Sequence, residues 1–283
     1  MTDFVEVADR VWVARQEWYD LNVCLVRGSA GLLVVDTQAS ARAARAIVDD
    51  VRALGIGDVT AVFNTHEHFD HTFGNGAFRE AYGAIPIVAH EVAAERTVEA
   101  GERIKALFAD EHDDPHREDV LETEIVVADH TFASVRVLDL GDRQVELVHP
   151  GRGHSFGDAV VRVADAEVLL AGDLVEESGP PVYGVDCHPF DWPSSLDVVL
   201  NLLSPGTLVV PGHGAVVDRA FVEEQRDAIA IVAQTIRDLA ASGVPADRAL
   251  ADGAWPFPRE GLAHAVALGF AALPPAGRSL PLA

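Results

Sequence analysis

Residues 65–71 read Thr-His-Glu-His-Phe-Asp-His, and their side chains are dense in metal-binding groups. His66, His68, Asp70 and His71 can each bind a metal ion. Imidazole and carboxylate ligands without thiolate suit zinc, and they also suit iron or manganese. Without a metal, so many histidines would repel one another when protonated and would need many partners when neutral. The stretch therefore predicts a metal site.

The element that positions these residues is a strand. Val59–Phe63 is β-branched and apolar, which is typical of a buried strand. If the chain stays extended through His68, residues 66 and 68 point to the same side, because a strand alternates with period two. Asp70 and His71 are adjacent, so a turn into a following helix must bring them to a second point nearby. This spacing suits two neighbouring metal ions rather than one.

The rest of the sequence alternates short apolar stretches with amphipathic segments. The apolar stretches, separated by turn residues, predict strands over residues 11–14, 22–26, 31–36, 85–89, 135–140, 144–149, 159–163, 167–170 and 208–210. Apolar residues at helical spacing predict helices over residues 40–54, 77–82, 90–107, 193–203, 221–241 and 260–272.

Three further metal-capable residues follow predicted strands. His154 lies in a glycine-rich stretch, Asp173 follows Gly172 at a strand end, and His213 lies between two glycines. Glycine permits a tight loop and a close approach of the backbone to such a site. These positions, together with the first motif, resemble the conserved elements of the metallo-β-lactamase superfamily over roughly residues 5–225.

The resemblance implies an αββα four-layer sandwich, with two mixed sheets packed face to face and the metal site at one edge. It also implies two zinc ions per chain, with iron or manganese as alternatives. Aspartate at position 173 is similar to glyoxalase II-like and lactonase-like members, whereas the β-lactamases of the superfamily often carry Cys or Ser there. The implied ligands are His66, His68 and His154 for the first ion, Asp70, His71 and His213 for the second, and Asp173 for both.

The activity that this resemblance implies is that of a metal-dependent hydrolase. A hydroxide bridging the two zinc ions would attack a small acyl substrate, namely an ester, a lactone or a thioester. Asp70 would act as a catalytic residue that orients the nucleophile. The alternative is a persulfide dioxygenase-like oxidoreductase of the same fold, with a single iron held by His66, His154 and Asp173. The identity of the metal separates the two hypotheses.

Substrate contacts are expected from residues 176–192, which are rich in proline, glycine and aromatic residues. This stretch follows Asp173, so it is expected to line the mouth of the pocket. Packing of the loop on itself accounts for the same residues equally well. The candidate contacts are Tyr183, His188, Asp191 and Trp192.

Composition limits the classes of partner. The net charge of −24 disfavours a nucleic-acid surface and an anionic membrane, which both need clustered Lys and Arg. Two cysteines in 283 residues fit a reducing compartment, and no signal peptide or membrane span is evident, so we expect a cytoplasmic protein. We expect one domain over residues 1–283, with a helical extension after about residue 243. The oligomeric state stays open.

Overall fold

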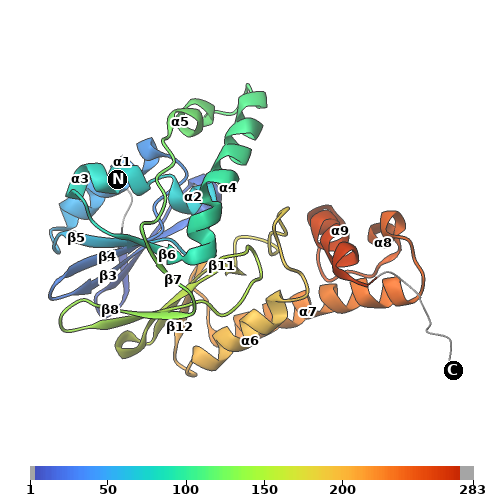
Figure 1. The fold of residues 1–283 in the computed structure, drawn as a ribbon. Coiled ribbons are helices and arrows are strands. Elements are labelled where there is room, and N and C mark those ends of the chain that lie inside the picture. Colours follow the sequence, from blue (N-terminus) through green and yellow to red (C-terminus); the bar gives the residue numbers. More distant parts are fainter. Residues whose placement is uncertain (1–3, 275–283) are drawn as a thin grey trace.

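A computed structural model describes residues 4–274. Two β-sheets pack face to face in it, and helices cover the outer face of each sheet (Figure 1). The αββα sandwich expected from the sequence is therefore confirmed. The single domain expected over residues 1–283 includes residues 1–3 and 275–283, which lie outside the described range.

The first sheet has seven strands in the described part of the chain, in the order β1-β2-β3-β4-β5-β6-β7. Neighbours are antiparallel from β1 to β4 and parallel from β4 to β7. The strands are β1 (Val5–Ala8), β2 (Val11–Arg15), β3 (Asn22–Gly28), β4 (Gly31–Val35), β5 (Val59–Phe63), β6 (Ile87–His90) and β7 (His130–Phe132).

The second sheet has five strands within residues 4–274, in the order β12-β11-β10-β9-β8. Strands β11 and β12 are parallel, and the other neighbours are antiparallel. The strands are β8 (Val135–Asp139), β9 (Gln144–Val148), β10 (Val160–Val163), β11 (Val168–Glu176) and β12 (Leu208–His213).

Helices α1 to α5 lie on the side of the first sheet, and α6 and α7 lie on the side of the second (Figure 1). No helix in residues 4–274 is both long enough and apolar enough to cross a membrane. The helices are α1 (Ala41–Leu54), α2 (Phe69–Thr72), α3 (Asn75–Tyr82), α4 (Glu91–Asp110), α5 (Arg117–Glu122), α6 (Trp192–Leu202), α7 (Arg219–Ala241), α8 (Ala246–Asp252) and α9 (Ala263–Ala272), with 3₁₀ turns η1 (Trp18–Asp20), η2 (Ala164–Ala166) and η3 (Arg259–Leu262).

Strand β4 shows how the layers are held together. Leu33 and Val35 face the second sheet and belong to the core between the sheets, whereas Leu32 and Val34 face α1 and α3. All four side chains are almost completely buried. A strand covered on both faces reads as a continuous apolar run, because both sets of alternating side chains leave water. The run is therefore a consequence of the central position of β4.

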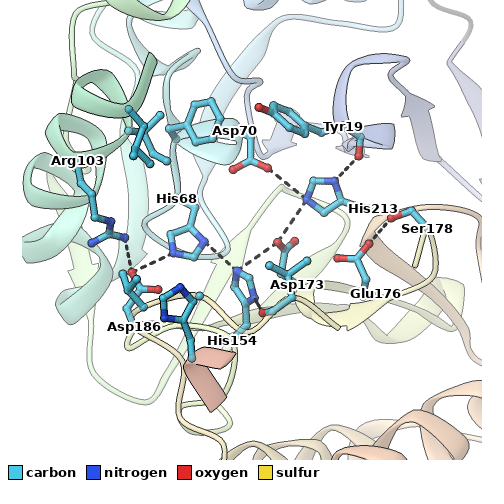
Figure 2. A pocket seen from close by; sticks show the side chains of 17 residues that line it. Tyr19, His68, Asp70, Arg103, His154, Asp173, Glu176, Ser178, Asp186 and His213 are labelled. Atoms are coloured by element: carbon cyan, nitrogen blue, oxygen red, sulfur yellow. Dashed lines mark hydrogen bonds and ion pairs between the residues drawn. The ribbon is translucent and has the colours of Figure 1, made fainter. Parts of the chain in front are cut away.

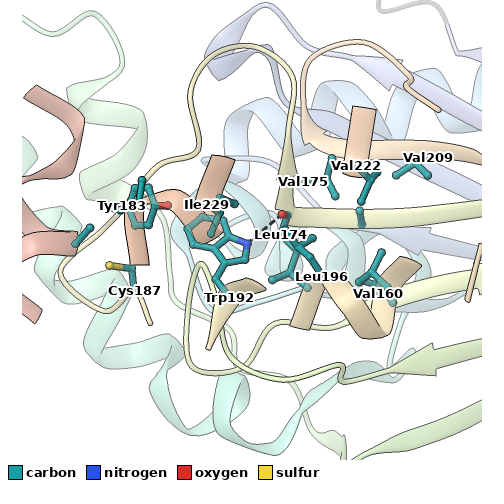
Figure 3. Packing of buried hydrophobic residues seen from close by; sticks show 14 of the residues in the cluster. Val160, Leu174, Val175, Tyr183, Cys187, Trp192, Leu196, Val209, Val222 and Ile229 are labelled. Atoms are coloured by element: carbon teal, nitrogen blue, oxygen red, sulfur yellow. Dashed lines mark hydrogen bonds between the residues drawn. The ribbon is translucent and has the colours of Figure 1, made fainter. Parts of the chain in front are cut away.

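The outer face of the second sheet carries another core, built on Trp192 (Figure 3). The Trp192 indole is fully buried, and its N–H donates to the carbonyl oxygen of Leu174. Residues 246–272 form α8, η3 and α9, and α8 and α9 pack on α7 beside this core. Val266 of α9 and Ile236 of α7 are both buried members of it.

Candidate metal centre

Parallel strands of the two sheets end at one edge of the sandwich, and the seven candidate ligands meet there. His66 and His68 follow β5, and Asp70 and His71 lie in α2. The other three come from the second sheet: His154 from the loop after β9, Asp173 from β11, and His213 from the end of β12. Residues from distant parts of the sequence thus share one buried cluster.

The ligand atoms fall into close groups. Within residues 4–274, several groups of three donors have ligand atoms that all lie within 4.8 Å of one another. Two of these groups share no residue and are called the first and the second cluster here. Asp173 lies between these two clusters, because its Oδ2 atom is 3.4 Å from His154 Nε2 and 3.3 Å from His213 Nε2. The first cluster is His66, His68 and His154, and the second is Asp70, His71 and His213.

Oxygen acceptors fix the rings of the first cluster. His154 Nδ1 lies 3.0 Å from the carbonyl oxygen of Val182, and His68 Nε2 lies 3.2 Å from a carboxylate oxygen of Asp186 (Figure 2). If each of these nitrogens carries the ring proton, the opposite nitrogens are unprotonated. Those opposite atoms, His154 Nε2 and His68 Nδ1, lie only 2.8 Å apart. Burial lowers the pKa of His68, but the hydrogen bond to Asp186 outweighs it and raises the pKa to about 9, so without a metal ion the second ring proton of His68 lies in this contact. A cation that replaces this proton would find both nitrogens pointing toward it.

Oxygen acceptors also orient two histidine rings of the second cluster. His213 Nδ1 lies 2.7 Å from the carbonyl oxygen of Tyr19, and His71 Nδ1 lies 2.9 Å from a carboxylate oxygen of Asp36. The opposite nitrogens, both Nε2, are 3.3 Å apart. Asp36 also accepts from the backbone N–H and the hydroxyl of Thr65, so one carboxylate supports both halves of the first motif.

Two buried polar atoms show that the cluster fits a metal. In the described part of the chain, His66 Nε2 has no hydrogen-bond partner, and Asp173 Oδ1 makes no hydrogen bond of good geometry, although it lies 3.2 Å from His71 Nε2. A buried polar atom without a partner destabilises a fold unless an ion or water satisfies it. A donor set of imidazole and carboxylate suits zinc, iron or manganese. Metal ions at this position would satisfy both atoms.

Burial and neighbouring charges shift the pKa values of several of the candidate ligands. Burial holds the pKa of His66 well below its usual range and lowers that of His154 to about 4, so both rings are neutral lone-pair donors near neutral pH. Burial also raises the pKa of Asp70, but His71 and His213 outweigh it and the net pKa falls to about 2. For His213 itself, the nearby Asp173 outweighs burial and raises the pKa. Without a metal ion, a proton there partly balances the carboxylates.

A second buried network ties the two ligand loops together. Glu67 lies between two ligands and Ser155 follows another, and the Ser155 hydroxyl lies 3.0 Å from Glu67 and 2.7 Å from Asp158. A hydroxyl has only one hydrogen to donate. A proton on one of the two carboxyl groups therefore completes the network. Burial raises the pKa of Asp158 to about 7, which makes it the carboxyl group that holds this proton.

A cavity of about 480 Å³ opens above the cluster (Figure 2). Its floor includes Asp70, Asp173 and His213, and the exposed His264 of α9 contributes to its wall. The extension after residue 243 therefore reaches the site.

The four residues expected to contact the substrate do not line this cavity. Tyr183 and Trp192 pack against each other, with ring centroids 5.0 Å apart, and both are buried. His188 and Asp191 lie in the turn that leads into α6. The large aromatic rings lie in the core because burial of their apolar surface stabilises the fold more than contact with water would. The stretch 176–192 does line the cavity, but through residues 176, 178, 182 and 184–186.

Sequence reasoning missed the residues that orient the ligands. Asp36 ends a predicted strand next to the metal motif in the sheet, and this position was a usable signal. Asp186 and the carbonyl groups of Tyr19 and Val182 carried no local signal, because their roles depend on contacts across long separations in the sequence.

Gly212 provides a direct test of the cluster. A Cβ atom at this position would lie 1.8 Å from Asp173 Oδ1. We expect Gly212→Ala to displace that carboxylate and to weaken zinc binding at least about tenfold, measured by competition with a chromophoric chelator. The matched control is Gly206→Ala, whose Cβ would meet its nearest heavy atom at 3.6 Å. Unchanged zinc affinity in Gly212→Ala would contradict the placement of Asp173 among the ligands.

The Asp158 network predicts a dependence of stability on pH. The pKa of Asp158 is about 7 in the folded state, whereas an unfolded aspartate has a pKa of about 3.9. Folding therefore favours the protonated form, so the stabilisation is complete below about pH 4 and is lost as the pH rises through about 7. Asp158→Asn does not titrate, and it should remove a slope of up to about 1.4 kcal/mol per pH unit.

The measurement is the free energy of unfolding by urea, in metal-free protein, between pH 5 and pH 8. The control is Asp49→Asn, because that carboxylate is 79% exposed. Parallel curves for the wild type and Asp158→Asn would show that Asp158 does not carry the proton.

Comparison with known proteins agrees with this geometry. The family model described as the Metallo-beta-lactamase superfamily matches residues 18–213. A curated relative from Bacillus cereus, named metallo-beta-lactamase type 2, is 27% identical over 203 residues, which are 71% of this chain and 70% of the relative. A relative of the same name from Bacillus sp. (strain 170) is 27% identical over 205 residues, covering 71% of this chain and 69% of the relative.

Solved structures show the same fold. A metallo-beta-lactamase from Pontibacter korlensis superposes with a TM-score of 0.66 at 19% identity, over 81% of this chain and 99% of that one. The FIM-1 metallo-beta-lactamase from Pseudomonas aeruginosa, solved in a mono-zinc form, gives a TM-score of 0.63 at 18% identity, over 81% of this chain and 94% of that one. Since the family model spans more than half of the sequence, the chain belongs to the metallo-beta-lactamase superfamily.

Proposed function

We propose that this protein is a hydrolase that uses two zinc ions to cleave a small acyl substrate, namely an ester, a lactone or a thioester. The observation that carries the proposal is the convergence of seven donors from separate segments into two adjoining clusters at the floor of one cavity. Oxygen acceptors orient four of the histidine rings so that their free nitrogens face one another.

The proposed ligands divide between the two clusters. His66, His68 and His154 would hold the first ion, and Asp70, His71 and His213 would hold the second. Asp173 would contact both ions. Bound zinc supplies a hydroxide near neutral pH and an electrophile for the substrate carbonyl.

Asp70 has a second role in this proposal. Its carboxylate lines the cavity and, with a pKa of about 2, it is an ionised acceptor throughout the neutral range. It would accept a hydrogen bond from the attacking water and hold it in position. In the overall reaction, the bond from the acyl carbon to the leaving atom breaks. The OH of water adds to that carbon, and the proton goes to the leaving atom.

Two other activities remain as outcomes of the same experiments. The curated relatives are named β-lactamases, and a β-lactam is also an acyl compound, so a β-lactam belongs in any substrate panel. A persulfide dioxygenase-like enzyme would use one iron, held by His66, His154 and Asp173. That ligand set leaves the second cluster without a role, which is why the two-zinc hydrolase is the stronger proposal.

The test removes two ligands of the first cluster. His66→Ala/His68→Ala should lose the first ion, and turnover of esters, lactones, thioesters and β-lactams should fall at least about 10³-fold. The matched control is His112→Ala/His130→Ala, which removes two exposed histidines outside the cavity. Zinc content and initial rates are measured on the same samples. Full activity in His66→Ala/His68→Ala would contradict the proposed function.

A further inference from the structure

The cavity above the metal centre has apolar walls. Helix α4 contributes Ile104 and Leu107, and the loop after β11 contributes Val182 and Val185. Phe69 of α2 completes this surface beside the floor. A cavity of about 480 Å³ falls within the range of small-molecule sites. It is larger than the ester or lactone group alone requires, so the walls have room for an additional part of the substrate.

Several of these side chains are also unusually exposed. Leu107 and Val182 are each 56% exposed, Val185 is 47% exposed, and Tyr19, which also lines the cavity, is 44% exposed. Ten large apolar side chains are exposed in residues 4–274, and these four gather around one opening. Single exposed apolar residues are ordinary, but a group of them around a cavity marks a surface that binds an apolar partner.

Charged groups near the cavity disfavour an anionic substrate arm. Among residues 4–274, Arg103 is the only Lys or Arg that lines the cavity. Its guanidinium is already paired with Asp186, which is buried and also contacts His68 (Figure 2). Glu176 adds a further carboxylate to the lining. An anionic arm that extends from the floor toward the opening would therefore leave water without gaining an unpaired cation.

We infer that the substrate is an uncharged ester or lactone with an apolar arm, a hydrocarbon chain or ring, that lies against Leu107, Val182 and Val185. This inference rests on the proposed hydrolase function. The reaction adds water across the acyl–oxygen bond, so an ester gives a carboxylic acid and an alcohol, and a lactone gives a hydroxy acid. The arm takes no part in the chemistry, and it determines which acyl compound is bound.

The first experiment compares methyl esters, with proton release as the readout. Methyl hexanoate should exceed methyl acetate in kcat/KM at least about tenfold, since each buried CH₂ strengthens binding by up to about fourfold. Monomethyl adipate has the same chain length but ends in a carboxylate, and its kcat/KM should be at least about tenfold below that of methyl hexanoate. Equal rates on methyl acetate and methyl hexanoate, or a preference for the adipate, would overturn the inference.

A pair of variants locates the effect. Leu107→Lys places a charge at the opening, and it should lower the ratio of kcat/KM for methyl hexanoate to kcat/KM for methyl acetate at least about tenfold. Val98→Lys adds the same charge to an exposed position of α4 outside the cavity, and it should change neither rate. Equal losses in both variants would show that the arm does not lie against Leu107.

A binding measurement separates this inference from the hydrolase proposal. 2-Octanone is uncharged and cannot be hydrolysed, and calorimetry measures its affinity directly. It should bind to the wild type and to Val98→Lys at least about tenfold more tightly than to Leu107→Lys. If no ester or lactone is turned over but this difference holds, the hydrolase proposal fails and the apolar site remains. If 2-octanone binds to none of the three proteins, the inference fails by itself.

Discussion

The structure depends on one constraint, which is that seven metal-capable donors from separate segments must face one another at one edge of the sandwich. His68 Nδ1 lies 2.8 Å from His154 Nε2, and the Nε2 atoms of His71 and His213 are 3.3 Å apart, so without a metal ion each pair needs a proton between its two nitrogens. Oxygen acceptors behind four of the rings keep the proton on the outer nitrogen. The same contacts that orient the rings therefore point the inner nitrogens at positions where a metal cation could replace the protons between them.

The ends of the strands in the two sheets bring these donors together. β5 and β12 each pair with a parallel neighbour, and their carboxyl ends meet at one edge, so each sheet presents its donors to the other. Close packing is needed for this meeting, as Gly212 shows, because even a methyl group there would collide with Asp173. The acceptors come from still other segments, namely the carbonyl groups of Tyr19 and Val182. The geometry of the site is thus a property of the whole fold.

Local patterns were sufficient to predict much of the fold. The apolar stretches at residues 31–36 and 144–149 predicted strands, and the structure contains β4 and β9 there, because burial on one or both faces of a strand requires apolar side chains. The same holds for the long helix α7, whose buried residues recur at helical spacing. Strand β7 (His130–Phe132) was missed, since three residues at a sheet edge carry too short a pattern.

The candidate site was also predicted only in part from the sequence. Its donors were visible because several histidines and aspartates at strand ends are typical of a metal site, and the structure brings all of them together. Which way a loop residue points was not visible. Tyr183 was expected in the pocket but is buried against Trp192, whereas its neighbours Val182 and Gly184 line the cavity. Adjacent residues of an irregular loop face opposite ways, and only tertiary packing decides which side is buried.

The most direct test of the account is the metal content of protein purified without added metal or chelator, measured by elemental analysis. The account predicts close to two zinc ions per chain, because two clusters of donors adjoin at Asp173. Close to one iron per chain would contradict the two-zinc hydrolase and support an oxygen-dependent redox enzyme. The absence of tightly bound metal would contradict the central claim that these buried donors are a metal site.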